Sequence, residues 1–205
     1  WRTATTLDYG SADRFYSYSV ATKRADTTRI ALRVPRDIPS GTVAFTNARV
    51  VTLKNREVLT GTLVVTGNRI SCVGRCAVPS GARVFNARGK TIIPGFIDVH
   101  SHNYREHRGI IPQQNPEGAI FLSYGITTTM DPSMWSQNLF PTREMVEAGL
   151  VVGPRVYTTG DPLYAGDGNR QEDFTTPAMA EAGILKLKHW GSVSLKQYQQ
   201  PRRDQ

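Results

Sequence analysis

The sequence has little cysteine, few acidic residues and no long apolar run. Its 205 residues include 2 Cys, 17 Asp plus Glu and 25 Lys plus Arg, which gives a formal net charge of +8 at pH 7. Two Cys are too few for a small disulfide-built domain. Thr or Gly interrupts every apolar stretch within a few positions, which excludes a membrane-spanning helix of about 20 residues. With 39% hydrophobic and 20% charged residues, the chain is expected to form a core and is neither disordered nor collagen-like.

The positive charge is scattered along the chain. Arg residues are spread over many segments, and only Arg202 and Arg203 are adjacent to one another. A protein surface that follows a phosphate backbone needs many cations along one face. We therefore expect a solvated basic surface and no nucleic-acid partner.

The two ends of the chain are unusual. The chain begins at Trp1 instead of Met, has no basic segment followed by an apolar one, and stops at Gln205 soon after a pattern typical of a helix start. We therefore expect a piece of a longer protein. Any export segment would precede Trp1, so the cytoplasm and the bacterial periplasm or exterior are equally open as compartments.

Cys72 and Cys76 lie four positions apart in a run with the composition of a strand. In an extended strand their Cα atoms would be roughly 13 Å apart at about 3.3 Å per residue, whereas a disulfide needs about 7 Å or less. Only a turn at Gly74-Arg75 would bring the two together. We therefore expect two small buried thiols, and a single Cys pair does not supply a zinc ligand set.

Residues 1–41 are predicted to form a β-hairpin and a linker. Apolar side chains alternate with polar ones at 15–20 and again at 29–34, so each run presents one apolar face. An isolated hairpin is marginally stable in water, so we expect it to belong to a larger β-structure. Residues 34–41 have the Pro and Gly content of a linker.

Residues 42–91 are predicted to form a small β-sandwich. Runs rich in Val and Thr have the length of strands and occur at 43–52, 61–66, 69–73 and 82–87. Gly67-Asn68, between two of these runs, fits a type II′ hairpin turn.

Residues 92–205 show strands that alternate with helices. Strand-like runs occur at 91–99, 125–130, 154–159 and 192–196, and helical stretches that open on Pro occur at 116–124, 141–149 and 177–189. This alternation predicts parallel βαβ units in an α/β fold. A closed (β/α)8 barrel needs about 250 residues, so this part would hold about four βα units, half of a barrel.

The sharpest motif is Pro94-Gly-Phe-Ile-Asp-Val-His-Ser-His102, at the end of the first predicted barrel strand. Side chains alternate along a strand, so Asp98, His100 and His102 share one face. Neutral imidazole is a common ligand of zinc and similar metals, and barrel active sites lie at the carboxyl ends of the strands. We therefore predict that His100 and His102 bind a metal ion. Without the surrounding strand and helix pattern, two polar loop His would be the simpler interpretation.

This motif is preceded by Asn47-Ala-Arg-Val-Val and Gly67-Asn-Arg-Ile-Ser-Cys-Val-Gly74. Together they make the chain resemble the metal-dependent amidohydrolase superfamily, in particular its cyclic amidohydrolase and imidazolonepropionase-like members. The resemblance covers residues 42–205 and is specific at 92–102. It implies a metal-binding barrel flanked by a β-sandwich, with one or two divalent ions, zinc above all. The N-terminal hairpin and linker resemble the end of a TolB-type β-propeller, which some bacterial members carry ahead of the hydrolase.

The family also has a bridging Lys, often carboxylated, at the end of its fourth barrel strand. Lys196 closes the fourth predicted strand here, so the resemblance implies that Lys196 bridges the metal ions. A desolvated Lys can lose its proton, and reaction with carbon dioxide would make it an anionic ligand. Because some relatives use another residue at this place, a solvated surface Lys stays the alternative. The remaining His ligands and the catalytic Asp of the family would lie beyond Gln205.

Other polar residues near the predicted strand ends are weaker candidates. Three from the first loop of the barrel are candidate substrate contacts: Tyr104, Arg105 and His107. Asp131 and Asp161 each precede Pro, and we favour a turn-forming role for both over contact with substrate. His189 falls in a helical stretch and is expected on the helix surface.

The resemblance implies hydrolysis of an amide or cyclic amide C–N bond by a metal-activated water. The substrate would be a small molecule or a short peptide-like amide, and a homo-oligomer is compatible with this activity. The half barrel alone would be inactive, since it lacks ligands and leaves the edge of a parallel sheet unpaired. The alternative is a non-catalytic binding module, whose basic β-rich surface and propeller-like segment recruit an acidic or peptide partner while the barrel is a relic.

Overall fold

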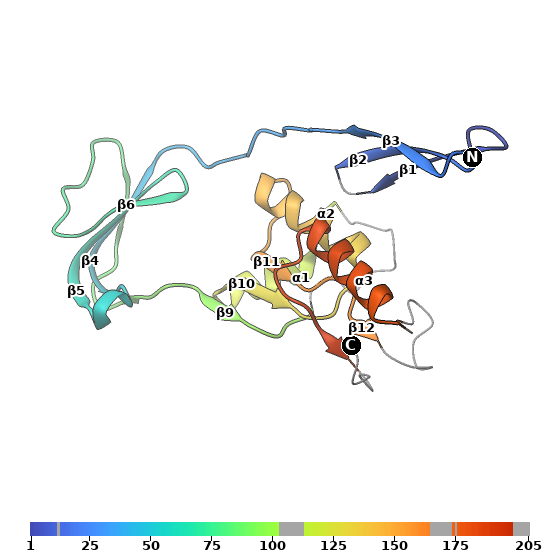
Figure 1. Cartoon of the computed structure of the whole chain (residues 1–205). Coiled ribbons are helices and arrows are strands. Elements are labelled where there is room, and N and C mark those ends of the chain that lie inside the picture. Colours follow the sequence, from blue (N-terminus) through green and yellow to red (C-terminus); the bar gives the residue numbers. More distant parts are fainter. Residues whose placement is uncertain (12, 103–112, 165–173, 175, 199–205) are drawn as a thin grey trace.

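The computed structural model describes residues 1–11, 13–102, 113–164, 174 and 176–198 (Figure 1). These residues form a mixed α/β structure in which two all-β parts precede a part with parallel strands and helices. Figure 1 shows the long extended segment that leads from the N-terminal strands to the second β part. The helices gather around the parallel strands, so the two kinds of structure are segregated along the chain.

The N-terminal part is a three-stranded antiparallel sheet. Its strands are β1 (Thr6–Ser11), β2 (Arg14–Ser19) and β3 (Arg24–Arg29), in that order. The expected hairpin is present, but the prediction that 29–34 forms its second strand is wrong. The chain turns back directly after β2, with Ser19 paired to Arg24 and Lys23 at a left-handed φ of 54°. Ile30, Leu32 and Val34 therefore follow the sheet in extended, exposed chain, because the turn and not the apolar alternation sets the register.

An ion pair ties β3 to the start of β2. Arg29 donates from Nε to Oδ2 of Asp13 at 2.7 Å. This hydrogen bond, together with the charges of Arg29, Arg14 and His189, lowers the pKa of Asp13 below its usual value although partial burial opposes the shift. The pair lies at the surface and therefore adds little to stability.

The second part is a five-stranded sheet built around β4. Its strands are β4 (Thr42–Val51), β5 (Val58–Thr66), β6 (Arg69–Gly74), β7 (Arg83–Asn86) and β8 (Thr91–Ile92), with a 3-10 turn, η1 (Lys54–Arg56), between β4 and β5. β5 pairs with β4 antiparallel, whereas β7 and β8 pair with it in parallel. Ala48, Val50 and Ala87 form a buried cluster on this sheet, against Phe45 and Ile92. Within the described residues, this segment contributes one layer, so the two-layered sandwich stays a prediction.

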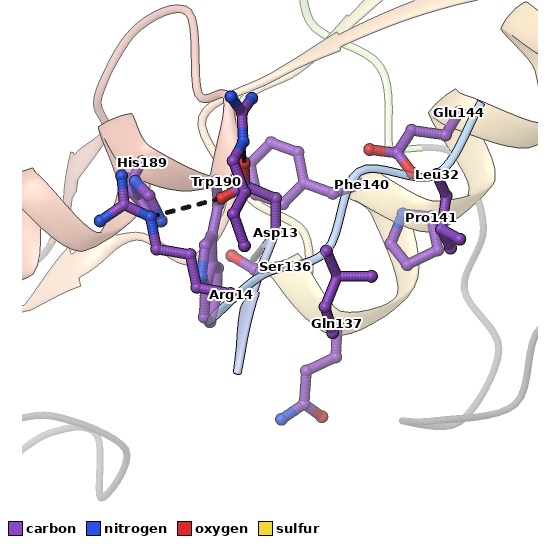
Figure 2. Close-up of a pocket in the computed structure, with 12 residues that line it drawn as sticks. Asp13, Arg14, Leu32, Ser136, Gln137, Phe140, Pro141, Glu144, His189 and Trp190 are labelled. Carbon is purple, nitrogen blue, oxygen red and sulfur yellow. Dashed lines mark hydrogen bonds and ion pairs between the residues drawn. The ribbon is translucent and has the colours of Figure 1, made fainter. Parts of the chain in front are cut away.

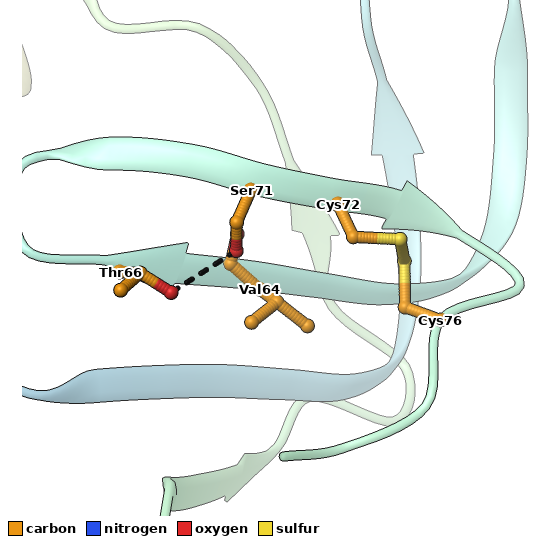
Figure 3. The surroundings of a disulfide bond; sticks show 5 residues. All are labelled: Val64, Thr66, Ser71, Cys72 and Cys76. Atoms are coloured by element: carbon orange, nitrogen blue, oxygen red, sulfur yellow. Dashed lines mark hydrogen bonds between the residues drawn. A yellow bond between two sulfur atoms is a disulfide. The ribbon is translucent and has the colours of Figure 1, made fainter.

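Cys72 and Cys76 form a disulfide, so the prediction of two free thiols is wrong (Figure 3). Their Cα atoms are 6.0 Å apart instead of the separation expected for an extended run. The reason is that β6 ends at Gly74, which has a left-handed φ of 103° and turns the chain back on itself. Cys76 then donates its N–H to the carbonyl of Gly74 at 3.1 Å. The bridge thus fixes the end of the edge strand β6 to the loop that follows.

Replacing both Cys72 and Cys76 by Ser is expected to lower the free energy of unfolding by about 2 kcal/mol, the chain-entropy value for so short a loop. Urea unfolding of the oxidised protein and of the double Ser variant measures the difference. The reduced wild-type protein is the matched control and should unfold like the variant. Equal midpoints for the oxidised and the reduced protein would show that the bridge does not constrain the unfolded chain.

The third part begins with three parallel strands. They are β9 (Phe96–Asp98), β10 (Ile126–Asp131) and β11 (Arg155–Thr158), and β10 lies between the other two. Three helices follow them in turn: α1 (Pro116–Ser123), α2 (Ser136–Ala148) and α3 (Pro177–Trp190). The predicted parallel βαβ arrangement is thus present for the first three strands. The single strand predicted at 91–99 is divided instead, because Ile92 ends β8 in the five-stranded sheet before Phe96 opens β9.

Two of the three helices begin where the sequence predicts. Asn115 caps α1 by accepting a hydrogen bond from the N–H of Glu117 at 2.8 Å, and Thr176 caps α3 by accepting one from Met179 at 3.2 Å. Each cap is followed by Pro at the first helical position, where the absent N–H costs no hydrogen bond. A polar cap before Pro is therefore a reliable local signal in this chain.

The helix α2 begins at Ser136, five residues before the predicted start at Pro141. Pro141 lies inside the helix and removes one backbone hydrogen bond. The turn before it is retained because Leu139 is fully buried and packs with Met134 and Val156 in a core cluster. Burial of a Leu side chain favours the structure by about 1.5–3 kcal/mol, which offsets the lost bond.

The fourth predicted strand is wrong in its position. Residues 192–196 are not a strand, and the short strand β13 (Gln197–Tyr198) follows them and pairs in parallel with β12 (Leu163–Tyr164). The chain reaches β13 along the end of β11, since Val193 donates its N–H to the carbonyl of Thr158 at 3.3 Å. Three parallel strands and one short pair are thus described, and half of a closed barrel stays a prediction. No helix in the described ranges has the length and apolar character needed to cross a membrane.

Candidate metal-binding site

The candidate site lies just beyond the carboxyl end of β9, beside the central strand β10. At the opposite end, directly before β9, a Cβ atom on Gly95 would overlap the side chain of Thr127 on β10, so only Gly fits there. After the last residue of β9, the N–H of Ser101 still donates to the carbonyl of Met130 at 3.0 Å. The chain that carries the two His therefore continues beside β10 after the strand has ended.

His100 and His102 lie side by side at this edge of the sheet. Their ring centroids are 5.4 Å apart and the ring planes are perpendicular, at 89°. Two imidazoles that bind one tetrahedral zinc ion at about 2.0–2.1 Å have centroids about 5 Å apart. The observed separation thus fits two ligands of a single ion. His100 is exposed and the side chain of His102 is 37% exposed, so solvent and small ligands reach both rings.

Asp131 is a site residue that the sequence analysis missed. It ends β10, its side chain is fully buried, and its Oδ1 lies 3.1 Å from Nδ1 of His102. The same Oδ1 accepts a hydrogen bond from the N–H of Ser133 at 3.1 Å, so the predicted turn role is also present. The contact could have been predicted from strand order: β10 is the parallel neighbour of β9, so the carboxyl ends of the two strands lie at the same edge of the sheet.

Lys196 is half-buried and directly precedes β13. Its carbonyl accepts a hydrogen bond from the N–H of Leu163 at 2.8 Å. Four residues earlier, Ser192 donates from its hydroxyl to the carbonyl of Thr159 at 2.9 Å, which places the approach to Lys196 at the carboxyl end of β11. Across the described ranges, no group of three or more His, Cys, Asp or Glu is arranged to hold a metal ion. The metal role of Lys196 therefore stays a prediction.

The other sequence candidates are divided between surface and structural roles. His189 is exposed on α3, as predicted. Asp161 accepts a hydrogen bond from the N–H of Ser136 at 3.4 Å and donates its own N–H to the Ser136 hydroxyl at 3.0 Å, so it anchors the first turn of α2. The three candidate substrate contacts lie outside the described residues: Tyr104, Arg105 and His107.

A separate pocket of about 940 Å³ lies between the N-terminal sheet and the helices α2 and α3 (Figure 2). Its apolar walls include Leu32, Phe140 and Trp190. Asp13 and Arg29 bring charge to it, but neither His100 nor His102 lines it. The pocket therefore contains none of the predicted metal ligands.

No family model matches the chain. Its sequence is 41% identical over 61 residues to an N-substituted formamide deformylase of Arthrobacter pascens, a match that covers 27% of this chain and 11% of that protein. It is 29% identical over 102 residues to a D-hydantoinase of Geobacillus stearothermophilus, over 46% of this chain and 22% of the relative. It is 33% identical over 82 residues to an adenine deaminase of Deinococcus deserti, over 40% and 15% of the two chains. The matches thus span less than a quarter of the length of these curated relatives.

Two solved structures have a similar fold. One is a protein of Bifidobacterium longum described as a prolidase, with a TM-score of 0.64, 22% identity, and coverage of 79% of this chain and 42% of that one. The other is a Xaa-Pro dipeptidase with bound methionine in its active site, with a TM-score of 0.59, 17% identity, and coverage of 76% and 46%. At these identities the likeness concerns the fold alone.

Proposed function

Because the chain belongs to the amidohydrolase superfamily, we propose that the protein of which it is part hydrolyses an amide or cyclic amide C–N bond with the help of a bound metal. The observation that carries this proposal is the pair of imidazoles at the carboxyl edge of the parallel strands, with ring centroids 5.4 Å apart. Active sites of α/β barrels lie at this edge. The names of three relatives, a formamide deformylase, a hydantoinase and an adenine deaminase, support a C–N bond as the bond that is hydrolysed.

His100 and His102 would hold a divalent metal ion, with zinc as the first choice. Two imidazoles are borderline ligands that suit zinc, and their separation fits a shared ion. When bound, such an ion lowers the pKa of a coordinated water to near neutrality and polarises the substrate carbonyl. We propose that Lys196 supplies a further, bridging ligand, since its segment follows the end of β11.

The chain's own residues also define how substrate approaches. The polar side chains of Thr129, Asp131 and Thr158, in or at the ends of β10 and β11, are fully buried and so do not reach the substrate directly. Both His rings face accessible space instead. We therefore propose that the substrate binds on the side of His100 and His102, where its carbonyl would meet the metal. The substrate would be a small amide, cyclic amide or short peptide-like amide.

The architecture belongs to the same proposal. We infer that the strands β9, β10 and β11 with the helices α1, α2 and α3 belong to the first βα units of a (β/α)8 barrel, predicted over residues 92–205, and that the five-stranded sheet is part of its flanking β-sandwich. The N-terminal sheet would be part of a propeller blade, since such blades are antiparallel sheets. The remaining ligands and the catalytic Asp would come from later barrel strands, so residues 1–205 alone would be inactive.

The activity is tested on the full-length parent protein with an N-formyl amine, a hydantoin and an Xaa-Pro dipeptide as substrates. We expect hydrolysis of at least one of them, loss of that activity after treatment with a chelator, and recovery with zinc. Metal analysis should find one or two ions per chain. Hydrolysis that persists after complete metal removal would contradict the proposal. A metal-free protein that binds an acidic partner in a salt-sensitive manner would identify the non-catalytic binding module instead.

A further inference from the structure

The structure points to Asp131 as the residue that orients His102, an inference that rests on the proposed metal centre. The carboxylate and the imidazole approach to 3.1 Å through Oδ1 and Nδ1. An ionised carboxylate only accepts hydrogen bonds, so the proton of this bond belongs to the imidazole. His102 then donates from Nδ1, and in the neutral ring Nε2 is left as the only lone pair for a metal.

Asp131 is held on both sides, as an orienting group must be. It ends the central strand β10, whose neighbour β9 is bound through Ser101 and Met130. On the other side, the N–H of Thr159 donates to the carbonyl of Asp131 at 3.1 Å. The N–H of Ser133 fixes the side-chain oxygen that faces His102. The carboxylate therefore has a defined position before any metal binds.

Burial strengthens this role. Asp131 is fully buried, while His102 is 37% exposed. A hydrogen bond to a charged group is roughly twice as strong as a neutral one, and the buried end of this bond is shielded from water. The exposed part of the ring stays accessible to a metal. Carboxylate, His and metal in this order form an arrangement whose outer partner commonly changes metal affinity by about 10- to 100-fold.

Asp161 provides a matched control. Asp161 lies shortly after the end of β11, whereas Asp131 is the last residue of β10. The Asp161 carboxylate also accepts a backbone hydrogen bond, but the donor is Ser136 and no His is involved in this bond. The variants Asp131→Asn and Asp161→Asn remove the same charge and keep the same volume. Asp131→Asn also keeps an oxygen for Ser133, so the turn at this place is retained. Asp131→Ala removes the acceptor altogether.

Two measurements on the full-length parent protein test the inference. Long-range 1H–15N NMR of the metal-free protein reports which ring nitrogen of His102 carries the proton. Competition with a chelator reports the affinity for zinc. We expect Nδ1 of His102 to be protonated in the wild type and in Asp161→Asn, with affinities within about threefold. Asp131→Asn keeps the oxygen that accepts from both Ser133 and His102, so it should keep Nδ1 protonated but bind zinc about tenfold more weakly because the charge is lost. Asp131→Ala removes the acceptor and should lose the preference and bind zinc about 100-fold more weakly.

The outcomes separate this inference from the proposed function. A wild-type His102 protonated on Nε2, or an equal loss of affinity in the Asp131→Asn and Asp161→Asn variants, would overturn the role of Asp131. If the wild type shows the expected protonation but binds no zinc, the metal proposal fails and the orientation of His102 by Asp131 stands. The NMR measurement needs only the wild type, so an unstable Asp131→Ala variant leaves the test intact.

Discussion

Replacing His100 and His102 together by Ala is expected to abolish zinc binding and to lower kcat/KM of the proposed full-length parent by more than about 10³-fold. The reason is that the proposed metal loses both imidazoles that this chain supplies to it. The fold should be unaffected, because His100 is exposed and His102 is only partly buried. Metal analysis and initial rates of hydrolysis measure the two effects, and circular dichroism confirms that the variant is folded.

His189→Ala is the control for this double variant. His189 is exposed on α3. Among the His residues that the structure describes, it alone lies outside the candidate site. Its removal should leave both the metal content and kcat/KM within about twofold of the wild type. Retention of stoichiometric zinc by the His100→Ala/His102→Ala variant would place the metal elsewhere in the protein.

The largest effect on stability is expected for Leu187→Ala. Leu187 is 2% exposed on α3 and packs close to Gly160, beyond the end of β11. Truncation of a fully buried Leu leaves a cavity and typically costs about 2–5 kcal/mol. Ala is the best helix former, so the helix itself is not weakened by this change. Urea unfolding should therefore show a lower midpoint with an unchanged slope.

Leu185→Ala, two positions earlier on the same helix, is the matched control. Leu185 is 54% exposed, so its truncation should change the free energy of unfolding by about 0.5 kcal/mol or less. Similar midpoints for the two variants would show that Leu187 does not pack against Gly160 as the structure has it. Because α3 leads to Ser192 and then to Lys196, Leu187→Ala should also displace the segment proposed to bridge the metal.

The candidate site was predictable only in part. His100 and His102 follow from a short motif at the end of an apolar run, because alternation along a strand is a local property. The contact of Asp131 with His102 joins residues 29 positions apart, and it depends on β9 and β10 being neighbours. Sequence alone supported the turn role of Asp131, which is local and is also present. The same limit applies to Lys196, whose predicted strand is displaced to β13.

Two errors in the fold prediction have different causes. An extended run predicts that Cys72 and Cys76 are too far apart for a bridge, but the left-handed φ of Gly74 turns the chain between them. The start of α2 was predicted at Pro141, whereas burial of Leu139 extends the helix back to Ser136. The first error comes from a left-handed turn inside the run itself, and the second from the packing of Leu139 against Val156 in a strand that follows the helix.

The sequence by itself determined the class of the fold, the order of the β and α segments, the helix starts at Asn115 and Thr176, and the two imidazoles. These features depend on side-chain periodicity, capping and turn chemistry, which act over a few residues. Only the tertiary structure decided the pairing of β9 with β10 and the buried carboxylate behind His102. Such contacts arise when distant segments share one core, and the free energy that selects them comes from burial and strand register across the whole chain.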